Sequence, residues 1–136
     1  LSGLVGSEMC IRDRVYIAPG GKHMRVVKKG TDYCIKLSDE PAIDGLRPCA
    51  NVMYESLENC QYDEITCVVL TGMGADGTKG IQGLAAHHKK LHVIAQDADT
   101  CVVYGMPKAI AQTGLVDEVV PLGSVAETIT KNVGVS

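Results

Sequence analysis

Hydrophobic and polar positions change their spacing along this chain, and the first clear pattern is a β-hairpin. Residues 24–38 alternate on either side of Lys29-Gly30, with Tyr33, Ile35 and Leu37 on one face. The apolar run just before it, VYIAP at 15–19, indicates a further short strand. The first third of the chain is therefore predicted to be β structure.

The rest of the chain alternates between continuous apolar runs and helical stripes. ITCVVLT at 65–71 and LHVIAQ at 91–96 are typical of strands buried on both faces, and LVDEVVPL at 115–122 predicts a third, short strand. Apolar stripes near a spacing of 3.6 predict helices that start at Pro48, run from Thr78 to about Lys90, run from Pro107 to Gly114, and follow a Ser124–Glu127 capping box. This order predicts a doubly wound α/β fold: a mostly parallel sheet in three αβα layers, with the hairpin attached.

Residues 1–14 fit neither pattern, and they join abruptly to the apolar run that follows. We interpret them as a foreign or disordered leader and assign the fold to residues 15–136. The net charge of −3 and the scattered cations do not favour a nucleic-acid partner. No apolar run approaches the ~20 residues of a membrane span, so no direct membrane insertion is expected.

The six cysteines contain no C-x-x-C pair and have mostly apolar neighbours. This usage indicates reduced core residues and favours a cytoplasmic protein.

The glycine-rich stretch Gly72–Gly77, GMGADG, has two possible functions. It fits the G-x-G-x-x-G pattern between a strand and a helix, and Asp97 follows Gly77 by 20 residues, as in dinucleotide-binding modules. However, Asp76 would lie beside the pyrophosphate, and like charges about 4 Å apart repel by roughly 4 kcal/mol at an effective dielectric near 20. The dinucleotide-binding module is therefore the alternative hypothesis.

The same loop suits a carboxylate with a catalytic task. Amides of the helix that follows would keep Asp76 ionised, and the loop lies at the carboxyl edge of a parallel sheet, where sites collect. A fixed, ionised acid can hold a catalytic histidine in one tautomer and stabilise its imidazolium form. A plain helix N-cap is the structural alternative, and the spacing alone does not decide between the two.

Four segments in order resemble the catalytic domain of CheB, the protein-glutamate methylesterase of bacterial chemotaxis. They are VYIAPGGKHM, LRPCANVMYES, VVLTGMGADGTKG and VIAQDADTCVVYGMPKAI, and the likeness runs from about Val15 to Lys131. The resemblance implies a hydrolase with a Ser-His-Asp triad and no cofactor. It would remove methyl groups from glutamates of chemoreceptors and, in many members, deamidate glutamines. The full-length protein would also carry a phosphorylatable receiver domain.

The resemblance places Asp76 at the triad aspartate. It places Met73 at a methionine whose backbone N–H helps to bind the oxyanion, with Gly72, Gly74, Gly77 and Met106 as further oxyanion or cleft-lining residues. The G-x-S-T-G-G and Q-H-M-P motifs that carry the serine and histidine do not occur in this sequence. We therefore expect an N-terminally truncated catalytic domain that is inactive alone.

Three histidines in HHKKLH, at positions 87, 88 and 92, could suggest a metal site. No acidic or cysteine partner lies near them in the sequence, so no metal is expected.

Overall fold

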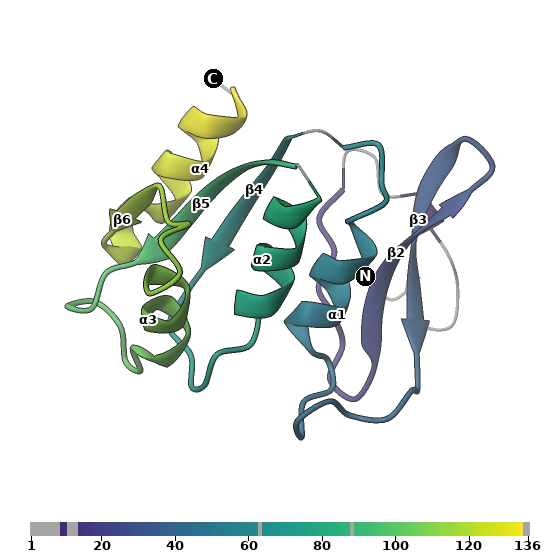
Figure 1. The fold of residues 1–136 in the computed structure, drawn as a ribbon, viewed down its shortest axis with the longest axis horizontal. Helices are drawn as coiled ribbons and strands as arrows, with labels where there is room; N and C mark the ends of the chain where they lie inside the picture. Colours follow the sequence, from purple (N-terminus) through teal and green to yellow (C-terminus); the bar gives the residue numbers. More distant parts are fainter. Residues whose placement is uncertain (1–8, 11–13, 63, 88, 135–136) are drawn as a thin grey trace.

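The computed structural model describes residues 9–10, 14–62, 64–87 and 89–134. Within these ranges the strands form an antiparallel and a parallel sheet, with helices between and around them (Figure 1). The antiparallel sheet has the order β1 (Met9–Cys10), β3 (Asp32–Ser38) and β2 (His23–Lys29). The parallel sheet has the order β4 (Glu64–Val69), β5 (Lys90–Gln96) and β6 (Glu118–Val120).

The predicted hairpin is confirmed. β2 and β3 pair antiparallel from His23 opposite Ser38 to Lys29 opposite Asp32, and Gly30 turns the chain at a φ of 65°. At Val26 the backbone amide donates to the Ser56 hydroxyl at 2.9 Å, which ties the hairpin to α1 (Ala50–Ser56). The hairpin sheet is therefore attached to the rest of the domain through this helix.

The parallel sheet is covered on both faces, as the α/β prediction requires. α2 (Thr78–Ala86) joins β4 to β5, and α3 (Gly105–Ala111) joins β5 to β6. Because the strand order advances in one direction, right-handed crossovers place these two helices on the same face. After β6, α4 (Val125–Val133) contacts β4 and β5 on the other face (Figure 1). The predicted doubly wound α/β architecture is confirmed.

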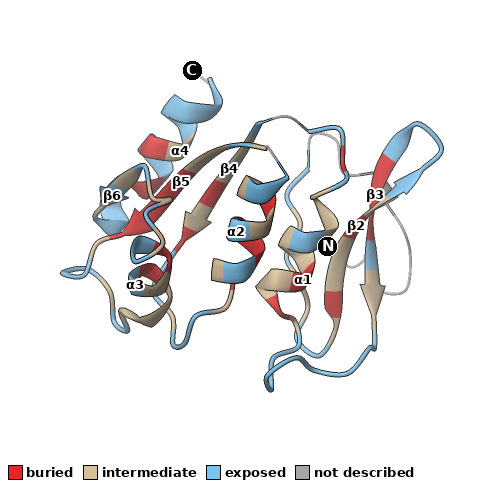
Figure 2. Ribbon diagram, in the orientation of Figure 1, coloured by how far each residue is buried: buried red, intermediate tan, exposed pale blue. Residues whose placement is uncertain are grey.

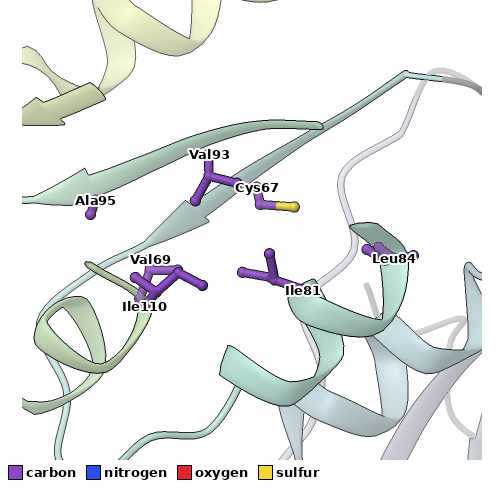
Figure 3. Packing of buried hydrophobic residues seen from close by; sticks show 7 residues of the cluster. All are labelled: Cys67, Val69, Ile81, Leu84, Val93, Ala95 and Ile110. Carbon is purple, nitrogen blue, oxygen red and sulfur yellow. The ribbon is translucent and has the colours of Figure 1, made fainter. Parts of the chain in front are cut away.

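The core lies between β4, β5 and the two crossover helices (Figure 3). Its central side chains are at most 5% exposed, and they are Cys67, Val69, Ile81, Leu84, Val93, Ala95 and Ile110. Figure 2 shows the same contrast along the chain, with buried residues on β4 and β5 and an exposed hairpin tip. Of the cysteines whose side chains the structure describes, Cys34, Cys49, Cys60 and Cys67 are buried with free thiols and Cys101 is half-buried.

α1 packs between the two sheets, against α2 and β2. Its approach to α2 is close at Gly80, where an added Cβ would lie 2.6 Å from the Tyr54 Cβ. Leu57, which follows α1, packs against both hydrophobic clusters. This helix therefore connects the antiparallel sheet to the parallel one and brings its own N-terminus to the loop that follows β4.

Some predicted local features are wrong. The run 15–19 is irregular rather than a strand, and Val15 and Ile17 are 82% and 63% exposed. The Ser124–Glu127 capping box does not form, because a 3₁₀ turn (Leu122–Ser124) leads directly into α4 and Ser124 makes no side-chain cap bond. α2 ends at Ala86 rather than near Lys90, since Lys90 already belongs to β5.

Within the predicted leader, Met9–Cys10 pair with Ile35 and Cys34 of β3. No regular element was predicted there, and the other positions before Arg14 lie outside the described residues. The interpretation of 1–14 as a foreign leader stays a prediction. Across the described residues, every helix is too short or too polar to cross a bilayer.

The contact between α1 and α2 can be tested with two glycines of α2. Alanine is favoured over glycine in a helix interior by about 1 kcal/mol. In Gly80→Ala this gain is outweighed by the overlap with Tyr54, and we expect a net destabilisation of about 1–3 kcal/mol. In the control Gly83→Ala the new methyl meets only the far end of the long Glu58 side chain, which can turn away, so stability should hold or rise. Urea unfolding compares the two, and equal midpoints would contradict the close contact.

Candidate active site

Asp76 lies in the loop between β4 and α2, and its carboxylate is held by the N-terminus of α1. Oδ2 accepts the backbone amide of Ala50 at 2.7 Å, and Oδ1 accepts that of Asn51 at 3.1 Å. The Cys49 thiol donates to Oδ1 at 3.2 Å. Free amides at a helix N-terminus carry partial positive charge, and here they bind an acidic side chain from another part of the chain.

The expectation that Asp76 contacts the helix after it is therefore wrong. The N-cap residue of α2 is Gly77, and the amides that bind Asp76 come from a helix about 25 residues earlier in the chain. The missed partners are Cys49, Ala50 and Asn51. The sequence does predict a helix after Pro48, and any helix has free amides at its start. The spacing of residues does not indicate which acidic side chain binds them.

Asn51 completes a second connection between the same two segments. Its side-chain oxygen accepts the amide of Gly77 at 3.0 Å and that of Gly80 at 2.9 Å. Gly77 has a φ of 94°, a left-handed conformation that favours glycine. Asp76 therefore binds the start of α1 while Asn51 binds the start of α2.

Two cavities meet at Asp76. The smaller has a volume of about 300 Å³ and is lined by Ala18, Met24, Pro48, Cys49, Ala50, Met53 and Asp76. The larger, about 630 Å³, is lined by Ile43, Asp44, Leu46, Cys49, Asn51, Met73, Gly74, Ala75, Asp76, Thr78, Lys79 and Gln82. Both volumes are in the range of small-molecule sites. The structure thus brings Asp76, Met73 and Gly74 together around one hollow.

The other predicted lining residues support the loop without lining either cavity. The Gly72 amide donates to the Val103 carbonyl at 3.0 Å, and the Gly72 carbonyl accepts the Met106 amide at 2.8 Å. The side chain of Met106 packs against the core, so close to Gly72 that an added Cβ there would lie 2.5 Å from its Sδ. Gly72 and Met106 therefore hold the base of the loop, and Gly77 starts α2.

Met73 lies in this loop and is 85% exposed. No described residue accepts a hydrogen bond from its backbone amide. Met73 also lines the larger cavity, so this amide lies beside the hollow that contains Asp76.

Several groups that a bound dinucleotide would use are already hydrogen-bonded within the chain. The amides of Gly77 and Gly80, which would face a pyrophosphate at the start of α2, already donate to Asn51. Asp97, the expected ribose partner, accepts the Thr100 amide at 3.0 Å and the Thr100 hydroxyl at 2.5 Å. We therefore do not propose a nucleotide site.

Of the three histidines in HHKKLH, the two that the structure describes contact different acidic residues. His87 is 3.6 Å from the Glu58 carboxylate, and His92 contacts Glu118 of β6 at 2.6 Å. His88 lies outside the described residues. Among the residues that the structure describes, no group of three His, Cys, Asp or Glu side chains could hold a metal ion.

Charge and burial act together on Cys49, which is 3% exposed. Burial raises the pKa of its thiol, and the hydrogen bond to Asp76 raises that pKa further. The thiol is therefore protonated at neutral pH, as the donor role toward Asp76 requires.

Parallel strands with helices on both faces define a doubly wound α/β domain, and the anchored acid marks a candidate site at the carboxyl edge of its sheet. The chain belongs to the CheB methylesterase family, whose family model matches residues 5–129. This confirms the resemblance inferred from the sequence motifs.

The relatives agree. The chain is 44% identical over 120 residues to the protein-glutamate methylesterase/protein-glutamine glutaminase of Desulfotalea psychrophila, covering 87% of this chain and 32% of that protein. It is 41% identical over 128 residues to the enzyme of the same name from Oceanobacillus iheyensis, covering 93% and 36%. The chain thus spans about a third of the length of these curated relatives.

A solved structure gives the same result. The Thermotoga maritima CheB methylesterase catalytic domain superposes with a TM-score of 0.78 at 33% identity, covering 85% of this chain and 60% of that chain. The family and the fold therefore agree, with the match confined to part of the catalytic domain.

The contact between Cys49 and Asp76 predicts a change in thiol reactivity. Asp76→Asn removes the charge that helps to keep the thiol protonated, so we expect Cys49 to react with iodoacetamide severalfold faster. Peptide mass mapping measures the rate, with the half-buried Cys101 of the same chain as internal reference. An unchanged ratio of the two rates would show that Asp76 does not act on this thiol.

Proposed function

We propose that this chain forms the acid-bearing part of a protein-glutamate methylesterase that hydrolyses glutamyl methyl esters on chemoreceptors and deamidates their glutamines. The observation that carries the proposal is the Asp76 carboxylate, fixed by three donors where two cavities meet. The names of the relatives support both reactions.

In the proposed mechanism Asp76 orients an imidazole and stabilises it after it has taken the proton of a serine hydroxyl. The serine oxygen then attacks the ester carbonyl, methanol leaves, and water releases the glutamate from the acyl-enzyme. The Met73 amide would stabilise the negative charge on the carbonyl oxygen, and such a donor typically lowers a barrier by about 3 kcal/mol.

We assign the serine and histidine to the family's G-x-S-T-G-G and Q-H-M-P motifs, which this sequence does not contain. The isolated chain is therefore proposed to have no methylesterase activity above background. The receiver domain and the chemoreceptors are proposed partners of the full-length protein.

A chimera tests this proposal. The 120 aligned residues of the Desulfotalea psychrophila relative are replaced by those of this chain, and methanol release from a methylated receptor is measured. We expect activity in the chimera and none in the isolated chain. Asp76→Asn should lower kcat steeply, since the equivalent change in a serine protease costs about 10⁴-fold.

Asp97→Asn is the matched control, because the Asp97 side chain accepts its hydrogen bonds from Thr100 of the same loop. It should leave kcat unchanged. A folded but inactive chimera, or an Asp76→Asn variant with full activity, would overturn the proposal, and so would hydrolysis by the isolated chain.

A further inference from the structure

Asp76, just before α2, binds the start of α1, and Asn51 of α1 binds the start of α2. The two carboxylate oxygens of Asp76 accept different numbers of hydrogen bonds. Oδ1 accepts both the Asn51 amide and the Cys49 thiol. Among the described residues, Oδ2 accepts only the Ala50 amide. Each carboxylate oxygen has two lone pairs, so Oδ1 is fully used and Oδ2 retains one acceptor position.

Asp76 lines both cavities, so a group that enters either one can approach its carboxylate, whose open acceptor position is on Oδ2. An imidazole N–H that approaches Asp76 would therefore bind Oδ2. The position of Oδ2 relative to the imidazole depends on how firmly the loop that carries Asp76 is held. The carboxylate is fixed relative to α1, whereas the backbone of its loop continues directly into α2.

The loop and α1 are joined through the side chain of Asn51. Its oxygen binds the amides of Gly77, the residue after Asp76, and of Gly80. Without that oxygen the backbone beside Asp76 loses two hydrogen bonds to α1, and the loop is held there only through the carboxylate itself. A carboxylate that can move relative to the helix presents Oδ2 over a range of positions.

We propose that Asn51 is a positioning residue for Asp76, which acts by holding the first turn of α2 so that Oδ2 stays aimed at the catalytic imidazole. The inference rests on the proposed methylesterase function. It also makes a claim about this chain alone, that the Asn51 side chain sets the position of Asp76.

The first test uses the 136-residue chain and needs no activity. In Asn51→Ala, Asp76 should withdraw from Cys49, so that alkylation of Cys49 relative to Cys101 rises toward the value of Asp76→Asn. In Asn51→Asp, which keeps an acceptor oxygen for both amides, the ratio should stay near that of the unmodified chain. An unchanged ratio in Asn51→Ala would overturn the inference whatever the chimera does.

The second test uses the active chimera. Asn51→Ala should lower kcat by about 10- to 100-fold with KM little changed, because the loss is one of alignment, and Asn51→Asp should recover most of it. Asn132→Ala is the matched control: Asn132 also makes two side-chain hydrogen bonds, to Glu118 and to the Thr128 carbonyl, but on α4.

Rates are expressed per folded molecule, from active-site titration. The Asn132 control should leave kcat unchanged even if it lowers the melting temperature. Full kcat per folded molecule in Asn51→Ala would overturn the positioning role, whereas an inactive unmodified chimera would count against the proposed function alone and leave the thiol test to decide the inference.

Discussion

The exchange of caps between α1 and α2 is the constraint on which the site depends. A short helix has few internal hydrogen bonds relative to its free ends, so the seven residues of α1 gain much of their order from partners outside the helix. Asp76 accepts hydrogen bonds from the first amides of α1, and the Asn51 side chain accepts hydrogen bonds from amides at the start of α2. Gly80 permits the close approach that both contacts require. We expect the loss of any of these contacts to loosen the position of the acid.

A second set of contacts fixes the other side of the loop. Gln96, fully buried at the end of β5, accepts the Thr71 amide at 2.8 Å and donates to the Thr100 carbonyl at 2.9 Å. It thereby ties the chain after β4 to the chain after β5. A buried amide group with both ends satisfied gives strong geometric definition, because any shift leaves a polar group unpaired in a dry environment. The glycine turn is thus held from two directions.

The architecture could be predicted from the sequence because parallel strands leave a strong pattern. β5 is buried along most of its length, and its apolar run gives that directly. The hairpin followed from alternation around Gly30. The strand predicted at 15–19 was wrong because an apolar run does not show whether a neighbouring strand is present to pair with it. The capping box at Ser124 failed for a local reason, since the preceding 3₁₀ turn leaves the serine backbone without the extended geometry of a cap.

The site was harder to predict than the fold. The glycines identified the loop, and family motifs pointed to Asp76 and Met73, but no periodicity relates Asp76 to the amides of Ala50 and Asn51. Such contacts depend on how two helices from separate parts of the chain cross. The difference between the two carboxylate oxygens of Asp76 can be seen only in the three-dimensional structure, which gives the positions of the donors.

Leu57 belongs to both hydrophobic clusters, and α1 contacts both the hairpin and the crossover helix. The antiparallel and the parallel sheet are therefore connected by packed side chains, because Leu57 and α1 contact both of them. Loss of either sheet would strip the other of part of its apolar cover, which disfavours half-unfolded species. The molecule should behave as a single cooperative unit in equilibrium melting, with no separate transition for the hairpin.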